Sequence, residues 1–309
     1  MPALYGFPDI EVIGVVDPFE ERRELLSKKF NNCACYNSLV PKLIEEIDAA
    51  IITTPPDTHV SLASILLRNN KYVLVEKPLA LALDDCTREL IEIERLSKTS
   101  LMMGFNHRYW QPAIDLREKL PDENKIISAQ INFTGDYSKW NPVSFRSDPL
   151  NDLGPHVFDL IRFIFNKEII SISADLINKH SINLKVRVTG DSIINCHIAH
   201  SNITKKSIKV IGSLNNYHIE LGSERLNPEF GTVRNLLDIK DRIKRKILRR
   251  TSPIKRSYQL QLADFFNFIR SNKPAVPGIE DGISAIRAIE TVLASINKNG
   301  KEVFTDEIK

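Results

Sequence analysis

The stretch 10–17, IEVIGVVD, is an apolar run that ends in an acidic residue and is followed by Pro18. This pattern predicts a buried β-strand that leads into a helix over residues 18–30. Further apolar runs lie at 49–53, 72–75 and 101–103, with helical patterns between them at 39–47, 57–68 and 84–96. Because these strands are apolar throughout and alternate with helices, we expect a parallel sheet covered on both faces.

The second half of the chain has a different pattern. Apolar and polar residues alternate over 125–133, 170–177, 182–188, 192–199 and 207–211, with one helical pattern at 153–165. A period of two predicts strands with one buried face, in a mixed and largely antiparallel open sheet. We therefore expect an α/β fold of two domains. A Rossmann-like parallel sheet occupies residues 1–105, and an α+β domain occupies 106–309, with its C-terminal helices near the domain junction.

Composition limits the class of protein. The 309 residues are 42% hydrophobic, which is enough for packed cores. No apolar run reaches the length of a membrane span, and no charged-then-apolar leader opens the chain, so we expect a cytoplasmic protein. None of the four cysteines has the spacing of zinc ligands, which predicts reduced thiols and no metal site.

The net charge of +3 is unevenly distributed. Residues 240–256 hold nine Lys or Arg and one Asp, whereas the rest of the chain carries a net charge of −5. Over 236–256 the apolar residues recur near helical spacing, which predicts an amphipathic helix with a cationic face. Such helices bind anionic membranes, but we favour a solvated helix packed on the protein or on a partner subunit. Without interleaved aromatic residues, the segment does not predict nucleic-acid binding.

Ligands of parallel sheets bind beyond the carboxyl ends of the strands. Asp17 ends the first expected strand, where a carboxylate accepts hydrogen bonds from the adenosine ribose and repels a 2′-phosphate, which favours NAD over NADP. An alternative is that Asp17 only caps the following helix. After the second apolar run, Thr54, Pro55 and His59 belong to a loop that is placed to border a nicotinamide ribose.

Two further strand ends carry candidate site residues. Glu76 and Lys77 directly follow the run 72–75, and a lysine there can polarise a substrate hydroxyl or relay its proton. The alternative is a solvated lysine at a strand end. Asn106 follows the last run and is a candidate contact of the nicotinamide or the substrate.

A third group of candidates lies around the helix expected at 153–165. Asp152 and His156 are four residues apart and share one helix face, where a carboxylate raises the pKa of an imidazole and suits it to act as a base. Asp159 could act on His156 from the other side or bind substrate. The alternative makes Asp152 a helix cap and His156 a surface residue. Trp140 and Arg146 precede this helix, and Arg146 is a candidate for binding a substrate phosphate or carboxylate.

These motifs occur in a fixed order: VVDP (15–18), ITTPPDTH (52–59), VEKPLA (75–80), GFNHRY (104–109) and DLGPHVFD (152–159). Together they resemble the Gfo/Idh/MocA family of NAD(P)-dependent oxidoreductases, and the likeness runs from about residue 2 to 303. The resemblance implies a Rossmann domain followed by a mixed-sheet domain that covers the cofactor. It also implies that Lys77 and His156 are the acid/base pair, with Asp152 orienting His156 or binding a substrate hydroxyl.

The sequence departs from the family pattern in two places. The family begins with a strand and a glycine-rich turn that hold the pyrophosphate, and residues 1–4 match only the later part of the helix that follows them. We therefore expect a sheet that lacks its first strand. An incomplete gene product is the explanation we favour, and a degenerate protein that no longer binds cofactor well is the other. In addition, SFRSDPLNDLGPH (144–156) has no glycine before Gly154, which indicates a shortened loop.

The expected function is hydride transfer between NAD and a secondary alcohol of a sugar, nucleotide-sugar or cyclitol, by an enzyme that forms homo-oligomers as is common in the family. NADP is the less favoured cofactor. The alternative is a cofactor-deficient relic that acts as a binding or interaction subunit. A third reading is a membrane-surface scaffold that depends on residues 240–256.

Overall fold

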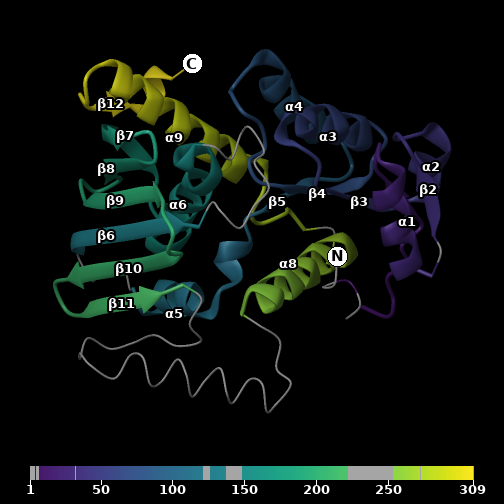
Figure 1. Cartoon of the computed structure of the whole chain (residues 1–309), viewed down its shortest axis with the longest axis horizontal. Coiled ribbons are helices and arrows are strands. Elements are labelled where there is room, and N and C mark those ends of the chain that lie inside the picture. The colour runs from purple at the N-terminus through teal and green to yellow at the C-terminus, as the bar shows by residue number, and fades with distance from the viewer. Residues whose placement is uncertain are drawn as a thin grey trace, which may run out of the picture.

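The computed structural model describes residues 4, 7–31, 33–120, 126–136, 148–221, 253–271 and 273–308. A parallel α/β part and a mixed-sheet part lie side by side (Figure 1). The predicted fold class is therefore confirmed, with a Rossmann-like sheet first along the chain and a mixed, mostly antiparallel sheet after it. No helix among the described residues is both long and apolar enough to cross a bilayer.

The strands β3 (Ala49–Ile52), β4 (Tyr72–Glu76) and β5 (Leu101–Gly104) pair in parallel. Side chains of β4 alternate between two cores. Val73 and Val75 pack with the helices α3 (His59–Arg68) and α4 (Asp85–Leu96), whereas Leu74 packs on the opposite face with the phenylalanines of α8 (Pro253–Ser271). Both faces are covered (Figure 1), which explains why these strands are apolar throughout.

A smaller parallel pair, β1 (Gly14–Val16) and β2 (Ala34–Tyr36), lies beside this sheet with α1 (Glu20–Lys29) and α2 (Pro41–Glu46). The buried strand expected from residue 10 onward is only partly formed, because Val15 is buried but Val16 is 37% exposed. Within the described ranges, β1 pairs with β2 alone and β3 with β4 alone. A strand that has only one neighbour in its sheet contacts fewer side chains, which accounts for the exposure of Val16 in β1.

The mixed sheet has the strand order β11-β10-β6-β9-β8-β7-β12, and its pairs are antiparallel except β6 with β9. Its strands are β6 (Ile126–Gly135), β7 (Ile169–Asn178), β8 (Ser181–Val188), β9 (Ile193–His200), β10 (Lys205–Gly212), β11 (Asn216–Glu220) and β12 (Val303–Phe304). The helices α5 (Gln111–Lys119), α6 (Pro149–Phe165) and α9 (Ile279–Asn297) lie on one face of it (Figure 1). Along β8, buried Leu184 and Val186 alternate with exposed Asn183 and Lys185, as the period of two predicted.

The helix α9 belongs to both hydrophobic cores. Ile283 and Ile286, in its first half, pack with the parallel sheet, whereas Ile289 and Val292 pack with the mixed sheet. A single rigid helix that fills both cores fixes how the two sheets are placed. The domain boundary after residue 105 stays a prediction.

Gly104, at the end of β5, allows a close approach between two strands that carry candidate site residues. A Cβ at Gly104 would lie 2.9 Å from both Glu76 Cα and Val75 O, which are backbone atoms that cannot rotate away. We predict that Gly104→Ala destabilises the fold by about 1–3 kcal/mol and lowers the melting temperature measured by circular dichroism by several degrees.

The matched control is Gly135→Ala at the end of β6, where an added Cβ would meet only Leu153 side-chain carbons at an ordinary distance of 3.5 Å. We expect the control to change the melting temperature far less. Equal effects of the two substitutions would contradict the tight approach at Gly104.

Candidate functional site

The two parts of the chain meet at Lys77 and Asp152. Lys77 Nζ donates to the Asp152 backbone oxygen at 2.6 Å and lies 3.3 Å from Asp152 Oδ1. From β9, His200 Nε2 lies 3.6 Å from Asp152 Oδ2. The Lys77 side chain is only 12% exposed, which differs from the solvated lysine considered as the alternative. A carboxylate that is shared by a lysine and a histidine therefore marks the junction of the two sheets.

The start of α6 places Asp152 and His156. The residue that caps this helix is Asp148, because its Oδ1 accepts a hydrogen bond from Leu150 N at 2.8 Å, and Pro149 occupies the first turn. Asp152 is therefore not the cap, and His156, one turn later, is buried. The structure therefore differs from the alternative in which Asp152 is a helix cap and His156 is a surface residue.

His156 contacts a second histidine. Its Nδ1 lies 2.9 Å from Nδ1 of His107, in the short helix η3 (Asn106–Tyr109) after β5. On its other side, His107 Nε2 lies 2.8 Å from Nζ of Lys206 in β10. Burial lowers the pKa of both histidines well below the ordinary value, and the nearby ammonium groups of Lys77 and Lys206 lower it further. Both rings are therefore neutral near pH 7.

Lys206 is a lysine whose ammonium group lies away from solvent. Burial lowers the pKa of Lys206 to about 8, the charge of Lys77 acts in the same direction, and Asp152 opposes them. Its ammonium lies 5.1 Å from the ring centre of Phe133 and 5.9 Å from that of Trp110. These rings offer it partial compensation for lost water. The site thus combines two lysines, three histidines and one carboxylate.

The expected cofactor residues lie at neighbouring strand ends. Thr54 and Pro55 follow β3, Glu76 and Lys77 come at the end of β4, and Asn106 follows β5. Since β3, β4 and β5 are adjacent and parallel, their carboxyl ends lie at one edge of the sheet.

The expected cofactor residue His59 instead has a position inside the protein. It is 1% exposed, and its two ring nitrogens lie 2.8 Å from the backbone oxygens of Thr54 and Pro78. Burial lowers its pKa. His59 therefore links the loop after β3 to the loop after β4 and helps to hold Thr54 and Lys77 at the edge of the sheet.

Asp17 lies at the end of β1, as predicted. Its Oδ1 accepts a hydrogen bond from Phe19 N at 2.8 Å, and Oδ2 lies 3.8 Å from Arg22 of α1. Asp17 thus shapes the turn before α1, and Phe19 is the residue that precedes the helix. The carboxylate is also partly exposed, so the turn does not occupy all of its acceptor capacity.

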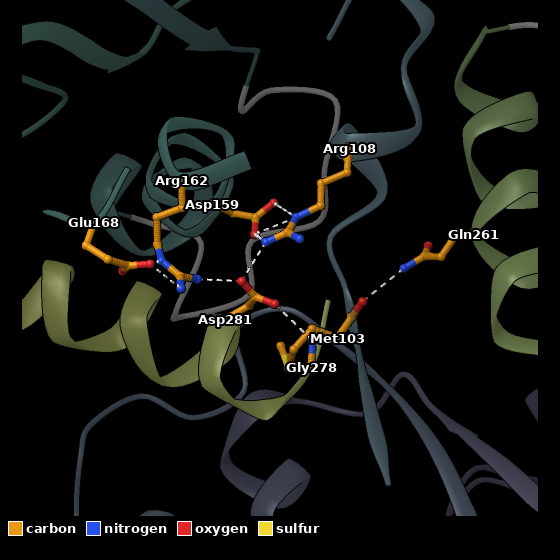
Figure 2. A network of polar contacts seen from close by, with 8 residues as sticks. All are labelled: Met103, Arg108, Asp159, Arg162, Glu168, Gln261, Gly278 and Asp281. Atoms are coloured by element: carbon orange, nitrogen blue, oxygen red, sulfur yellow. Dashed lines mark hydrogen bonds and ion pairs between the residues drawn. The ribbon is translucent and has the colours of Figure 1, made fainter. Parts of the chain in front are cut away.

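Asp159 belongs to an ion-pair network that supports the site (Figure 2). Its carboxylate is 1% exposed and receives Arg108 Nε and Nη2 at 2.6–3.0 Å. Arg108 Nη2 also donates to Asp281 Oδ1 of α9 at 2.7 Å, and Asp281 in turn pairs with Arg162 of α6. Arg108 contacts both carboxylate oxygens of Asp159, and the action of Asp159 on His156 or on substrate stays a prediction.

Some predicted residues lie outside the described ranges, and some described residues were not predicted. The described ranges do not include Trp140, Arg146 or residues 236–252 of the predicted amphipathic helix. The last residues of that predicted helix, 253–256, form the start of α8. Lys206 and His200 were missed, although the sequence contains a signal for both. Each is in phase with the buried residues of its strand, Lys206 with Ile208 and His200 with Ile198. A charged residue in phase with a buried face is a candidate for a functional position.

The described residues fit one half of a dinucleotide. Thr54, Lys77 and Asn106 offer a hydroxyl, an ammonium and an amide at adjacent strand ends, which suit a ribose and a nicotinamide amide. Asp17, on the separate β1–β2 pair, suits the hydroxyls of the second ribose. For the pyrophosphate, the described ranges contain no glycine-rich turn.

The fold and the site define a class of protein. A Rossmann-like sheet carries polar residues at its carboxyl edge, and a second, mixed sheet brings a carboxylate and histidines to the same place. This arrangement is typical of two-domain proteins that hold a dinucleotide on one domain and a substrate on the other.

Residues 1–105 match the Gfo/Idh/MocA family model, described as an oxidoreductase family with an NAD-binding Rossmann fold. The resemblance seen in the motifs is thereby confirmed. Inositol 2-dehydrogenase of Rhizobium meliloti is 27% identical over 175 residues, which cover 56% of this chain and 52% of that protein. Glucose-6-phosphate 3-dehydrogenase of Bacillus subtilis is 28% identical over 197 residues, which cover 60% and 55% respectively. The chain therefore spans about half the length of these relatives.

Solved structures extend the likeness of fold over the whole chain. A probable dehydrogenase from Thermotoga maritima superposes with a TM-score of 0.81 at 20% identity, covering 100% of this chain and 95% of that one. The myo-inositol dehydrogenase from Lactobacillus casei, solved with NAD(H) and myo-inositol, gives a TM-score of 0.74 at 19% identity, covering 95% and 88%. At these identities the likeness concerns the fold.

The network around Asp281 gives a prediction on stability. Burial alone would raise the pKa of Asp281, but Arg108 and Arg162 bring it below its ordinary value. Its contribution is therefore present at neutral pH and is lost as the pH falls through the folded-state pKa. We predict that Asp281→Asn lowers the free energy of unfolding by about 2–4 kcal/mol at pH 7, measured in urea, and that the loss shrinks in acid.

The control substitution in the same network is Glu168→Gln. Glu168 pairs with Arg162, but its side chain is 60% exposed. Solvent weakens exposed ion pairs, so we expect a loss of less than about 1 kcal/mol. A loss at Glu168 as large as that at Asp281 would contradict the view that burial of the network matters.

Proposed function

We propose that the protein is an NAD-dependent dehydrogenase that oxidises a secondary alcohol of a sugar, nucleotide-sugar or cyclitol. The observation that carries the proposal is the contact between Lys77, from the cofactor-side sheet, and Asp152, from the substrate-side helix. When bound, NAD would supply the hydride acceptor. The other half of the oxidation, removal of the hydroxyl proton, falls to residues of this chain.

Lys77 and Asp152 act on the substrate oxygen as a pair. The ammonium of Lys77 can donate a hydrogen bond to the hydroxyl oxygen and stabilise negative charge that develops on it. Asp152 holds this ammonium in place through its backbone oxygen and Oδ1. The neutral imidazole of His156, on the same face of α6, is the group we assign to accept the proton.

The names of the relatives support the substrate class. One relative is named an inositol 2-dehydrogenase and another a glucose-6-phosphate 3-dehydrogenase. Both names describe oxidation of a ring hydroxyl on a polyol. We therefore propose a carbohydrate or cyclitol alcohol for this chain, to be tested on a panel of cyclitols, free sugars, sugar phosphates and nucleotide-sugars.

The rival function is a binding subunit that has lost its cofactor. The buried lysine and histidines favour the enzyme, because buried titratable groups with perturbed pKa values are typical of functional sites. Titration with NADH, followed by its fluorescence, separates the two functions. Binding below millimolar concentrations supports the enzyme, and lack of binding at millimolar concentrations supports the relic.

We also propose that the chain forms homo-oligomers through the open face of the mixed sheet. Among the residues that the structure describes, the helices α5, α6 and α9 lie on one face of this sheet and no helix lies on the other (Figure 1). Light scattering coupled to size-exclusion chromatography measures the mass directly. A monomeric mass at micromolar concentrations would refute this part of the proposal.

Lys77 provides the most direct test of the proposed chemistry. We predict that Lys77→Ala lowers kcat by about a thousandfold or more, because it removes the charge that stabilises the reacting oxygen. The NADH dissociation constant should change little. A variant that keeps its turnover would contradict the role of Lys77.

Asp17 provides a test of cofactor choice. We predict that Asp17→Asn weakens NAD binding about tenfold, because an amide is a poorer acceptor than a carboxylate, and that it narrows the preference for NAD over NADP. The control is Glu21→Gln, an exposed substitution on the neighbouring helix α1, which should alter neither the affinity for NAD nor the preference for NAD over NADP. Unchanged preference in the Asp17 variant would show that this residue only shapes its turn.

A further inference from the structure

Lys206, His107 and His156 form a continuous chain of hydrogen bonds. The distances are 2.8 Å from Lys206 Nζ to His107 Nε2 and 2.9 Å from His107 Nδ1 to His156 Nδ1. The three residues come from β10, η3 and α6, so the chain joins three elements. Aromatic rings border it, since His107 stacks on Trp110 with ring centres 4.9 Å apart.

The ammonium form of Lys206 dictates the tautomer of both histidines. An ammonium has only donors, so His107 Nε2 must accept from it. The neutral ring of His107 then carries its proton on Nδ1 and donates it to Nδ1 of His156. As a result, His156 carries its own proton on Nε2. In this state the Nε2 atom is a donor and cannot take a proton from a substrate.

We propose that Lys206 is the end of a two-histidine proton relay and that it sets which ring nitrogen of His156 is free to act as a base. This inference rests on the proposed dehydrogenase function for its catalytic meaning. With Lys206 neutral, its lone pair accepts from His107 Nε2. His107 Nδ1 then accepts from His156 Nδ1, and His156 Nε2 is left with a lone pair.

The proton balance of the relay is simple. The substrate hydroxyl transfers its proton to His156 Nε2, His156 transfers its Nδ1 proton to His107 Nδ1, and His107 transfers its Nε2 proton to Lys206. One proton enters at His156, and one appears on Lys206 as an ammonium, while the hydride goes to NAD.

The direction of the pH dependence follows from this balance. The charged and titratable groups that act on the relay are Lys77 and Asp152, in addition to the three members themselves. Burial, together with the charge of Lys77, lowers the pKa of Lys206 to about 8. Alcohol oxidation needs neutral Lys206 and should therefore rise through this pKa. Carbonyl reduction needs the ammonium and should fall.

The test is nitrogen NMR of the protein labelled with ¹⁵N-histidine, without cofactor or substrate, from about pH 6 to about pH 10. Histidine nitrogen shifts report which ring atom carries the proton. We expect His156 and His107 to change tautomer together, with a midpoint near the pKa of Lys206, which is about 8. A single tautomer over the whole range would overturn the proposal, whether or not the protein is a dehydrogenase.

Two variants and a control sharpen this test. Lys206→Arg keeps a permanent donor, so His156 should stay protonated on Nε2 and oxidation should be slow at every pH. Lys206→Met removes the group, and the midpoint should disappear from both the spectrum and the pH profile. Lys205→Met, on the exposed neighbour, should leave both unchanged. A tautomer change that persists in the arginine variant would refute the relay even if the methionine variant fails to fold.

Discussion

The contact between the Lys77 ammonium and Asp152 is the constraint on which the rest of this structure depends. It joins the end of β4 to the first turn of α6, and so it requires the two sheets to be held in a fixed relation. A lysine that is only 12% exposed must regain the interactions that it lost with water. The backbone oxygen and the carboxylate of Asp152 supply them. Under the proposed function, the same contact holds the ammonium ready for the reacting hydroxyl.

Two features hold the parallel sheet and the mixed sheet in fixed positions relative to each other. The helix α9 fills both hydrophobic cores, and its residue Asp281 joins Arg108 to Arg162 between η3 and α6. The segment 104–109 is central because it supplies Gly104 for the close approach to β4, His107 for the histidine pair and Arg108 for the ion-pair network. Stability and the proposed chemistry therefore depend on the same short segment, which connects helices and strands of both parts.

The sequence allowed the main elements to be predicted, because long periodic patterns and continuous apolar runs are strong signals. Lys77 was expected at a strand end, and Asp152 and His156 on one helix face, from their local context alone. The strands β2 and β12 are too short to give a periodic pattern. The partners of these residues could not be predicted, since the contacts of Asp152 with His200 and of His107 with Lys206 depend on how distant strands pack. The phase of Lys206 and His200 with buried residues is the signal that was available.

A crystal structure of this chain soaked with NADH tests the central claim most directly. The claim is that the edge formed by β3, β4 and β5, together with the start of α6, is a single site for a nicotinamide and an alcohol. We predict density for the nicotinamide ring beside Lys77, with its ribose at the Thr54–Pro55 loop and His156 on the substrate side. Density for the dinucleotide elsewhere, or Lys77 turned away from a bound nicotinamide, would contradict the account.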